Sequence, residues 1–546
     1  MNTNTLQEAK ASFGIDLGTT YSAIAMIDEH GKPVVLKNDL GLPTTPSVVF
    51  FDEEGKVSVG QGAKAAIPSD PDRGKAFIKR KMGNPDFKFE VDGKNYSPAE
   101  ISALILKKLA QDAESQCNIP VKDVVITCPA YFGTIEKENT KLAGELAGFN
   151  VLNIINEPTA AAYAYAVKQK DPINILVYDL GGGTFDVTAM SVENDKIEVV
   201  ASGGDKTLGG KDWDFDIAKH IVDVWQEETG ETIKIISDDP EENEQLREDP
   251  NIKYIQEKLL LDVEGFKCVL SGASKVMASF SPIGLKPLMR YDLTREKFDE
   301  ITKGRLDTTI EKTKSVLEDA AKTLGHEFKF QKILLVGGST MMPQVATRIE
   351  EEFGIKPEFA DPNEAVAKGA AIYAQQGGEN ADNGEGNPVL VERLGKSYGI
   401  VAFDIGTNNE YVSIMLMRNT KLTKDEPAEN NRVFATIEAN VTSIPIVIME
   451  SEIGVWHENM NAAEMRCEMG EAVEVKRGDL KLPGNLPANS PIDVTFSSST
   501  DGILKVKAVC RDTGEECIVN VENACIMTEE EKKKSEIKIG GLTVQS

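Results

Sequence analysis

The sequence is poor in the residue patterns that build metal centres and disulfide frameworks. Its seven cysteines include no Cys-x-x-Cys pair, and its four histidines form no cluster with other metal-ligating types. These absences argue against a zinc site and against a disulfide framework, so we expect reduced, structural thiols. Cys510 and Cys517 flank a predicted hairpin turn and could face each other, but two unpaired thiols are the favoured interpretation.

Long apolar runs and an excess of positive charge are also missing. No stretch approaches the roughly twenty apolar residues that span a bilayer, and the N-terminus carries no signal-peptide pattern. With 60 basic against 88 acidic residues, the net charge of −28 repels nucleic acid and anionic membranes over most of the surface. We therefore expect a cytoplasmic protein whose partners include neither nucleic acid nor a membrane.

The length and the hydrophobic pattern predict more than one folded domain. At 546 residues the chain is longer than one core usually supports. After a polar stretch of about twelve residues, apolar strands alternate with amphipathic helices as far as about Gln376, which predicts an α/β domain. Ser97 and Glu100 form a capping box with Pro98 between them, so a helix is expected to begin there.

The composition changes after the α/β part. Residues 377–387 consist of glycine, asparagine and acids with one alanine, which is typical of a linker. Short alternating strands follow, for example Leu504–Cys510, and predict an antiparallel β domain. The charged run at residues 528–535 is suited to begin a helix. An earlier run, residues 238–250, carries seven acids and is expected to be a solvated loop.

Two segments repeat one pattern: an apolar strand, an aspartate, a glycine-bearing turn and a second apolar strand. They are Ile15–Ser22 and Tyr178–Asp186. The glycines let backbone N–H groups approach phosphate oxygens closely, and the threonine hydroxyls add donors. Carboxylates beside phosphate require a bridging cation, and Mg²⁺ held largely through its waters fits this need. The repetition predicts a duplicated lobe that binds phosphate.

A single copy of this pattern is more often a tight β-hairpin, and the repetition favours the phosphate site. A third copy, Phe403–Thr407, has no partner in its own domain, so it is assigned to a strand-end loop without a phosphate role. Lys79 supplies the cation that a γ-phosphate site needs, and Glu157 precedes a helix begun by proline. Residues 333–343 read as a buried strand, a glycine turn and a helix start, which suits the adenosine end of a nucleotide.

These motifs, in this order, resemble the seventy-kilodalton heat-shock chaperone family, the DnaK-type proteins, over residues from about 13 to 530. The resemblance implies ATP and Mg²⁺ as cofactors, and it allows K⁺ as a further ion. The catalytic residues that it implies are Lys79, Glu157, Asp179, Thr184 and Asp186, with Asp16 and Asp179 holding Mg²⁺ through water. The nucleotide-binding residues that it implies are Asp16, Gly18, Thr19, Thr20, Tyr21, Gly181, Gly182, Gly183, Gly209, Gly210, Glu264, Lys267, Cys268, Ser271, Gly337, Gly338, Ser339 and Asn363.

The resemblance also implies an order of domains. An actin-like (ribonuclease H-like), two-lobed α/β ATPase domain comes first, and an antiparallel β-sandwich that binds peptide follows it. The implied divisions are a flexible N-terminus at 1–12, the nucleotide-binding domain at 13–376, the linker at 377–392, the β-sandwich at 393–527 and a short tail at 528–546, a vestige of a helical lid.

In this family the β domain holds an extended apolar peptide by main-chain hydrogen bonds and one deep pocket. The residues at the matching positions are all apolar, and they are Ile400, Phe403, Phe434, Ile437, Ile444 and Ile446. The same residues would also suit the core of the sandwich, and the sequence alone does not separate the two roles. Extra residues near Asp404–Asn408 lengthen a loop that would flank the peptide.

Several positions depart from the family pattern. Val389–Glu392 resembles the apolar interdomain linker, and Pro129 matches the proline switch, but Lys137 stands where an arginine is usual. Cys268 replaces the arginine that stacks on adenine, and Asn153 replaces the arginine that receives a J-domain co-chaperone. A lysine lacks the planar fork of arginine, so Lys137 predicts weakened coupling. Cys268 predicts modestly weaker adenine recognition, and Asn153 predicts poor stimulation by a J-domain.

The sequence therefore predicts an ATP-dependent chaperone that couples ATP binding and hydrolysis to binding of extended apolar polypeptide. Its expected partners are unfolded clients, a J-domain co-chaperone and a nucleotide exchange factor. One alternative is an actin-like small-molecule kinase for a sugar or acid, and another is a filament-forming relative. A kinase needs a positioned base for its acceptor hydroxyl and has no need of the linker and β domain, so the chaperone is favoured.

Overall fold

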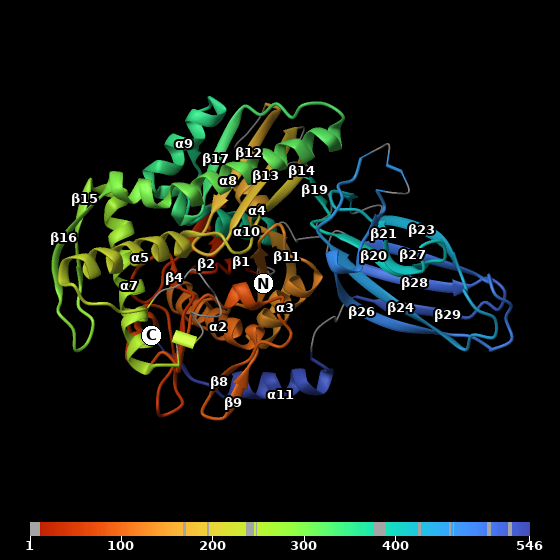
Figure 1. The fold of residues 1–546 in the computed structure, drawn as a ribbon, viewed down its shortest axis with the longest axis horizontal. Coiled ribbons are helices and arrows are strands. Elements are labelled where there is room, and N and C mark those ends of the chain that lie inside the picture. Colours follow the sequence, from red (N-terminus) through yellow and green to blue (C-terminus); the bar gives the residue numbers. More distant parts are fainter. Residues whose placement is uncertain are drawn as a thin grey trace, which may run out of the picture.

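Helices and strands alternate in the first two-thirds of the chain, and strands dominate the rest (Figure 1). The computed structural model describes residues 11–166, 171–193, 196–235, 245–246, 248–375, 389–423, 427–457, 460–461, 464–498, 504–521 and 527–545. The predicted linker at 377–387 and most of the acidic run at 238–250 lie outside these ranges. Among the helices within them, none combines the length and the apolar character needed to cross a membrane.

A mixed sheet organises the start of the chain. Strands β1 and β2 form an antiparallel hairpin that β3 extends, while β10 and β11 continue in parallel on the other side of β1. The main strands are β1 (Ser12–Asp16), β2 (Tyr21–Ile27), β3 (Pro33–Leu36), β10 (Asp123–Cys128) and β11 (Asn150–Asn156). Shorter strands are β4 (Thr45–Pro46), β5 (Val49–Phe51), β6 (Val57–Val59), β7 (Gly74–Lys75), β8 (Phe89–Val91) and β9 (Lys94–Tyr96).

A second mixed sheet repeats this strand order. Strands β12, β13 and β14 form an antiparallel meander, and β17 and β18 continue in parallel from β12. The order β18-β17-β12-β13-β14 therefore corresponds to β11-β10-β1-β2-β3, in agreement with the two echoing motifs. The strands are β12 (Ile173–Leu180), β13 (Phe185–Glu193), β14 (Lys196–Asp205), β17 (Lys332–Val336) and β18 (Glu358–Phe359).

Helices cover these sheets. Ser97 caps α2 as the sequence predicts: its hydroxyl accepts from the Glu100 amide at 3.2 Å, and its own amide donates to the Glu100 carboxylate at 2.9 Å. The longer helices are α2 (Pro98–Cys117), α3 (Thr134–Leu146), α4 (Glu157–Ala166), α5 (Gly210–Thr229), α7 (Pro250–Gly272), α8 (Arg295–Leu324), α9 (Pro343–Phe353) and α10 (Ala365–Gln375). A short helix α1 (Gln61–Ala66) and the hairpin of β15 (Lys275–Phe280) and β16 (Leu288–Thr294) complete this part.

Helices α4 and α10 pack backbone against backbone. An added Cβ on Gly369 of α10 would overlap the carbonyl oxygen of Ala160 in α4, and one on Gly14 of β1 would overlap the backbone of Ala371. Such close approach is open only to glycine at these positions. The first residue of α4 and the turn before α10 are therefore held near the ends of both sheets.

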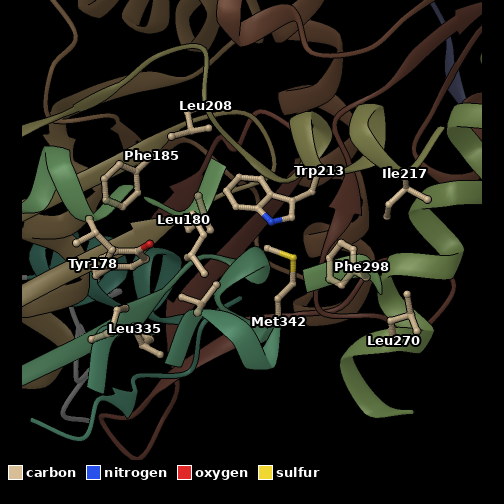
Figure 2. Close-up of a cluster of buried hydrophobic side chains, with 14 of the residues drawn as sticks. Tyr178, Leu180, Phe185, Leu208, Trp213, Ile217, Leu270, Phe298, Leu335 and Met342 are labelled. Carbon is tan, nitrogen blue, oxygen red and sulfur yellow. The ribbon is translucent and has the colours of Figure 1, made fainter. Parts of the chain in front are cut away.

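The second sheet packs on α5, α7 and α8 through a large apolar cluster (Figure 2). The indole of Trp213, in the first turn of α5, lies in this cluster with Leu180, Phe185 and Met342, and all four side chains are buried. Burial of large aromatic side chains is a main source of stability in such a core. The cluster fixes the start of α5 beside the turn between β12 and β13.

The C-terminal strands form two antiparallel sheets, as predicted, with the orders β25-β21-β20-β24-β26 and β23-β27-β28-β29. Ile448, Phe496 and Val506 are buried between them. The strands of these two sheets are β20 (Ser397–Asp404), β21 (Asn409–Leu416), β23 (Ala428–Ala435), β24 (Ser443–Ser451), β25 (Arg466–Cys467), β26 (Ala472–Lys481), β27 (Pro491–Ser498), β28 (Leu504–Cys510) and β29 (Glu516–Asn520). The short strand β22 (Lys421–Leu422) belongs instead to the second mixed sheet. We call residues 397–521 the β region and residues 11–375 the N-terminal region.

The cysteines in the described part of the chain are all free. In the hairpin of β28 and β29, Cys517 lies opposite Ala508 and not opposite Cys510.

Two segments of the chain join the N-terminal region to the β region. Strand β19 (Val389–Arg393) pairs with β14 on one side and with β22 on the other. After the β region, the charged run forms helix α11 (Glu529–Gly540) with a capping box between Thr528 and Glu531, so the predicted helix is confirmed. Strand β30 (Val544–Gln545) follows and pairs with β6.

The packing of α10 yields a test with a matched control. We expect Gly369→Ala to lower the free energy of unfolding by about 1–3 kcal/mol, because the added methyl group meets the α4 backbone. Gly265→Ala, in the exposed part of α7 where no atom lies within 4 Å of the new methyl, should raise it by about 0.5–1 kcal/mol. Urea unfolding of both variants checks this, and equal effects would contradict the packing described.

Candidate functional site

A cavity of about 310 Å³ opens where the two mixed sheets face each other. Most residues predicted for a nucleotide line it, although they come from segments more than three hundred residues apart. The predicted residues on its wall are Asp16, Gly18, Thr19, Thr20, Tyr21, Glu157, Asp179, Gly181, Gly182, Thr184, Glu264, Lys267, Cys268, Ser271, Gly337, Gly338, Ser339 and Asn363. The remaining residues predicted for this site are not among those that line the cavity, and they are Lys79, Gly183, Asp186, Gly209 and Gly210.

Four carboxylates and one lysine gather at one end of the cavity. Asp16 ends β1, Asp179 and Asp186 lie on the adjoining ends of β12 and β13, and Glu157 opens α4. Lys79 is buried in a short 3₁₀ turn (Ile78–Lys81) and forms an ion pair with Glu157. These positions follow from the fold, because strand ends and a helix start converge on one edge.

Hydrogen bonds orient two of these carboxylates. The hydroxyl of Thr127 donates to Asp16 at 3.3 Å, and the amide of Ala130 donates to Asp186 at 3.0 Å. Ala130 follows Pro129, the residue that matches the proline switch. A movement of this proline would therefore reach Asp186 through one peptide group.

Burial makes the negative charge of this cluster costly. Burial, followed by the neighbouring Glu157, raises the pKa of Asp16 to about 7, and the same two causes raise the pKa values of Asp179 and Asp186 well above the usual range. Burial lowers the pKa of Lys79, but Glu157 and Asp16 outweigh it and the net pKa is raised. Four carboxylates thus share one permanent cation, and a further cation would relieve their repulsion.

The two glycine turns face each other across the cavity. An added Cβ on Gly182 would overlap the side chain of Thr20, and one on Gly183 would overlap Thr19. The hydroxyl of Thr20 is buried and has no hydrogen-bond partner within the described ranges. A narrow glycine-lined cradle with an unsatisfied hydroxyl fits a phosphate group, which needs closely approaching donors.

A metal ion that is bound through its coordinated water molecules fits this chemistry. No group of three or more His, Cys, Asp or Glu side chains in the described residues has the geometry of direct ligation. Mg²⁺ keeps several of its waters, so the carboxylates of Asp16 and Asp179 could hold it without direct contact.

The other end of the cavity is built by α5, α7 and the turn after β17. Lys267 donates to the carbonyl of Gly210 at 2.8 Å and pairs with buried Asp214 at 2.8 Å. Gly337 has a φ of 82°, and this left-handed conformation lets the turn pass close to Asp179. Cys268 also lines this end of the cavity, and its side chain is exposed.

Ion pairs bridge the mouth of the cavity. The Lys64 amine, on α1, lies 2.5 Å from the Glu264 carboxylate on α7, and the hydroxyl of Tyr21 donates to Glu264 at 3.0 Å. Arg80 pairs with Asp212 at 2.8 Å. Because each pair joins the two mixed sheets or their helices, the mouth can open only when these pairs separate.

The sequence analysis missed several lining residues, and among them are Phe77, Lys211 and Asp214. The amine of Lys211 lies 4.6 Å from the ring centre of Phe77, and burial raises the pKa of Asp214 to about 6 against the opposing charge of Lys267. Phe77 and Lys211 lie within two residues of predicted site residues, but nothing in their local pattern marks them. Their positions on the wall depend on how the turn at Phe77 packs against the start of α5.

The six residues predicted for a peptide pocket divide into three pairs. Ile400 and Ile446 are buried in the β-region core, Phe434 and Ile444 pack on its edge, and Phe403 and Ile437 are exposed. Asp404 pairs with Arg466 at 2.7 Å in the β20–β21 turn, so the third glycine motif is the strand-end loop that was expected.

Strand β19 connects the cavity to the β region. The amide of Asn156, next to Glu157, donates to the buried Glu392 carboxylate at 2.9 Å, and the charge of Lys137 acts on the same carboxylate. Burial nevertheless raises the pKa of Glu392. Arg393 donates to the Val199 carbonyl at 2.7 Å and to the Asn419 carbonyl at 2.9 Å, so it touches both regions.

Asn153, the position predicted to receive a co-chaperone, is half-buried, and its amide donates to the Tyr373 hydroxyl at 3.1 Å.

A comparison with protein-family models supports one assignment for most of the chain. The model described as Hsp70 protein matches residues 12–90 and 84–538, which is nearly the whole chain.

The raised carboxyl pKa values predict proton release on ligand binding. A cation near Asp16 favours its charged form, so binding of preformed MgATP at pH 6.5 should release protons, and the affinity should fall by up to about tenfold per pH unit below pH 7. The same raised pKa means that, without a cation, the stability contributed by protonated Asp16 is present below pH 3.8 and is lost as the pH rises through about 7.

Calorimetry of MgATP binding in two buffers with different ionisation heats measures this release. Asp16→Asn should reduce it, and identical apparent heats in both buffers would contradict the electrostatic description.

Proposed function

This chain belongs to the Hsp70 family, whose members are chaperones with ATPase activity, and we propose that it couples binding and hydrolysis of ATP to the binding of extended apolar polypeptide. The observation that carries the proposal is the contact between Asn156 and Glu392 at 2.9 Å. It links the residue beside Glu157 in the cavity to the strand that leads into the β region.

We propose the family's domain order for this chain. Residues 13–376 would be an actin-like, two-lobed ATPase domain, which the repeated strand order of the two mixed sheets supports. Residues 377–392 would be the linker, 393–527 the peptide-binding β-sandwich and 528–546 the tail, with residues 1–12 preceding them. The pairing of β19 with β14 supports a linker that docks on the ATPase domain.

The cavity would hold ATP with Mg²⁺. Backbone N–H groups of the turns at 18–20 and 181–183 would bind the phosphates, while Lys267 and Ser339 would border the nucleoside. The bound ion would supply a Lewis acid for the terminal phosphate. Asp16 and Asp179 would hold it through water.

The chain's own residues would then position the reaction. Lys79 would bring positive charge to the γ-phosphate, held in place by Glu157. Asp186, oriented by the Ala130 amide, would hold a proton from the attacking water, and Thr184 would orient that water. Burial of these groups strengthens each interaction.

The partners proposed for the chain follow the family. Unfolded polypeptides would be its clients, and a J-domain co-chaperone and an exchange factor would act on it. The half-buried Asn153 supports a weak response to a general J-domain, because it lacks the positive charge that an acidic partner surface requires. A small-molecule kinase would make no use of the Asn156–Glu392 contact or of the β region.

Removal of the Glu392 carboxylate tests the proposed coupling. We expect Glu392→Ala to keep basal ATP turnover within about twofold but to reduce the effect of ATP on peptide affinity by about tenfold, since coupling energies are typically 1–3 kcal/mol. Glu474→Ala, an exposed carboxylate of β26 paired with Arg477, is the control. An unchanged effect of ATP in Glu392→Ala would remove this contact from the mechanism.

Peptide exchange tests the proposed function directly. A labelled apolar peptide should bind, ATP should weaken the binding, and dissociation should be fast even in ADP, because α11 lies against α2 and α3 and does not act as a lid. The measurement is fluorescence anisotropy after addition of excess unlabelled peptide. Absence of binding in both nucleotide states would refute the chaperone function and leave the ATPase untouched.

A further inference from the structure

The segment Met527–Gln545 lies against the N-terminal region, although it follows the β region in the chain (Figure 1). Strand β30 adds to the edge of β6, with Val544 opposite Val57, and the Val57 amide donates to the Thr543 carbonyl at 3.2 Å. Ile539 of α11 is fully buried in the apolar cluster of the first sheet. The segment therefore completes a core made largely of residues from the start of the chain.

Lysines make specific contacts along this segment. Lys538 lies 2.5 Å from the Glu100 carboxylate, donates to the Asn95 carbonyl at 2.9 Å and lies over the Tyr96 ring at 4.6 Å. Glu100 and Tyr96 are each only 2% exposed. A carboxylate buried to this degree needs its cation, so the site is built for Lys538.

Two further lysines hold the same segment. Lys107 of α2 donates to the carbonyl of Ile539, in the last turn of α11, at 2.9 Å and to that of Leu542, just beyond the helix, at 3.3 Å. Lys532 pairs with Glu145 of α3 at 2.6 Å. Polar and apolar contacts thus fix both the position and the direction of the segment.

Chain length limits what the β region can do while this segment is docked. Val521 is buried in the β-region core, and Met527 packs on the core of the N-terminal region. They are six residues apart in the sequence, so they can be at most about 22 Å apart in any conformation. The other end of the β region is held by the pairing of β19 with β14.

We propose that Met527–Gln545 is a strap that keeps the β region docked on the N-terminal region, so that full separation requires release of the strap. When β19 separates from β14, the strap keeps the β region at a high effective concentration near its docking surface, so docking is restored quickly. The proposal does not depend on ATP turnover. It predicts a β region that stays close to the N-terminal region in the absence of nucleotide.

The docked interface offers a readout remote from the strap. The hydroxyl of Thr134 donates to the Tyr398 hydroxyl at 3.0 Å, and Arg418 pairs with Asp319 at 2.7 Å. Strand β19 lies in the same interface. Hydrogen exchange of the amides of β19 and of residues 131–135 therefore reports separation of the two regions.

The first experiment lengthens the connection without changing any contact described. Insertion of about thirty Gly and Ser residues between Val521 and Met527 leaves the strap docked but removes the limit on reach. Because effective concentration falls with about the 3/2 power of length, exchange at β19 should rise by about tenfold in the nucleotide-free protein. Unchanged exchange at β19 in this variant would overturn the proposal.

The second experiment releases the strap. The double variant Lys532→Glu, Lys538→Glu should speed exchange in α11 and, as a consequence, at β19. Adding Glu145→Lys to the Lys532→Glu single variant restores the ion pair with its charges exchanged. This second change should slow exchange in α11 by about two- to fivefold relative to Lys532→Glu alone. Lys534→Glu, on the exposed side of α11, is the matched control and should leave both rates unchanged. If exchange became fast in α11 while the amides of β19 stayed protected, the segment would not hold the β region in place, and the strap proposal would be refuted.

Discussion

The fold depends on one close contact, the backbone packing of α4 against α10. Gly369 sits against the carbonyl of Ala160, and Gly14 lets β1 approach α10 equally closely. With no side chains between them, the first residue of α4 and the turn before α10 have little freedom to move apart. Glu157 and Asn363 are consequently fixed on the wall of the cavity, facing the aspartates that end β1 and β12.

This geometry concentrates more negative charge than the protein itself neutralises. Lys79 is buried with Glu157, and the pKa of Asp16 rises to about 7 because burial and Glu157 both oppose its ionisation. A cation would relieve this repulsion, and an anionic ligand bridged by that cation would complete the site, which is why MgATP is the ligand that we propose. Asn156, which precedes Glu157, donates to Glu392, and in the proposed function this contact links the site to the β region.

Local chemistry could be predicted from the sequence wherever the signal lies within a few residues. The capping box at Ser97, the two glycine turns and the helix that begins after Thr528 are of this kind. The positions of Phe77 and Lys211 could not be predicted, because they depend on how the turn at Phe77 and the start of α5 pack against each other. Alternating apolar residues could not show that Ile400 is core whereas Ile437 is exposed, and the polar sequence of α11 gives no sign that Lys538 meets a buried glutamate 438 residues earlier.

In the proposed function, the cavity with its cluster of carboxylates hydrolyses ATP, and this hydrolysis controls polypeptide binding by the β region. The most direct test is release of inorganic phosphate from ATP by the full chain, with no acceptor added, in the absence and presence of an unfolded apolar polypeptide. The account predicts slow release that the polypeptide accelerates. Phosphate transfer that requires a sugar or acid acceptor and ignores the polypeptide would contradict it.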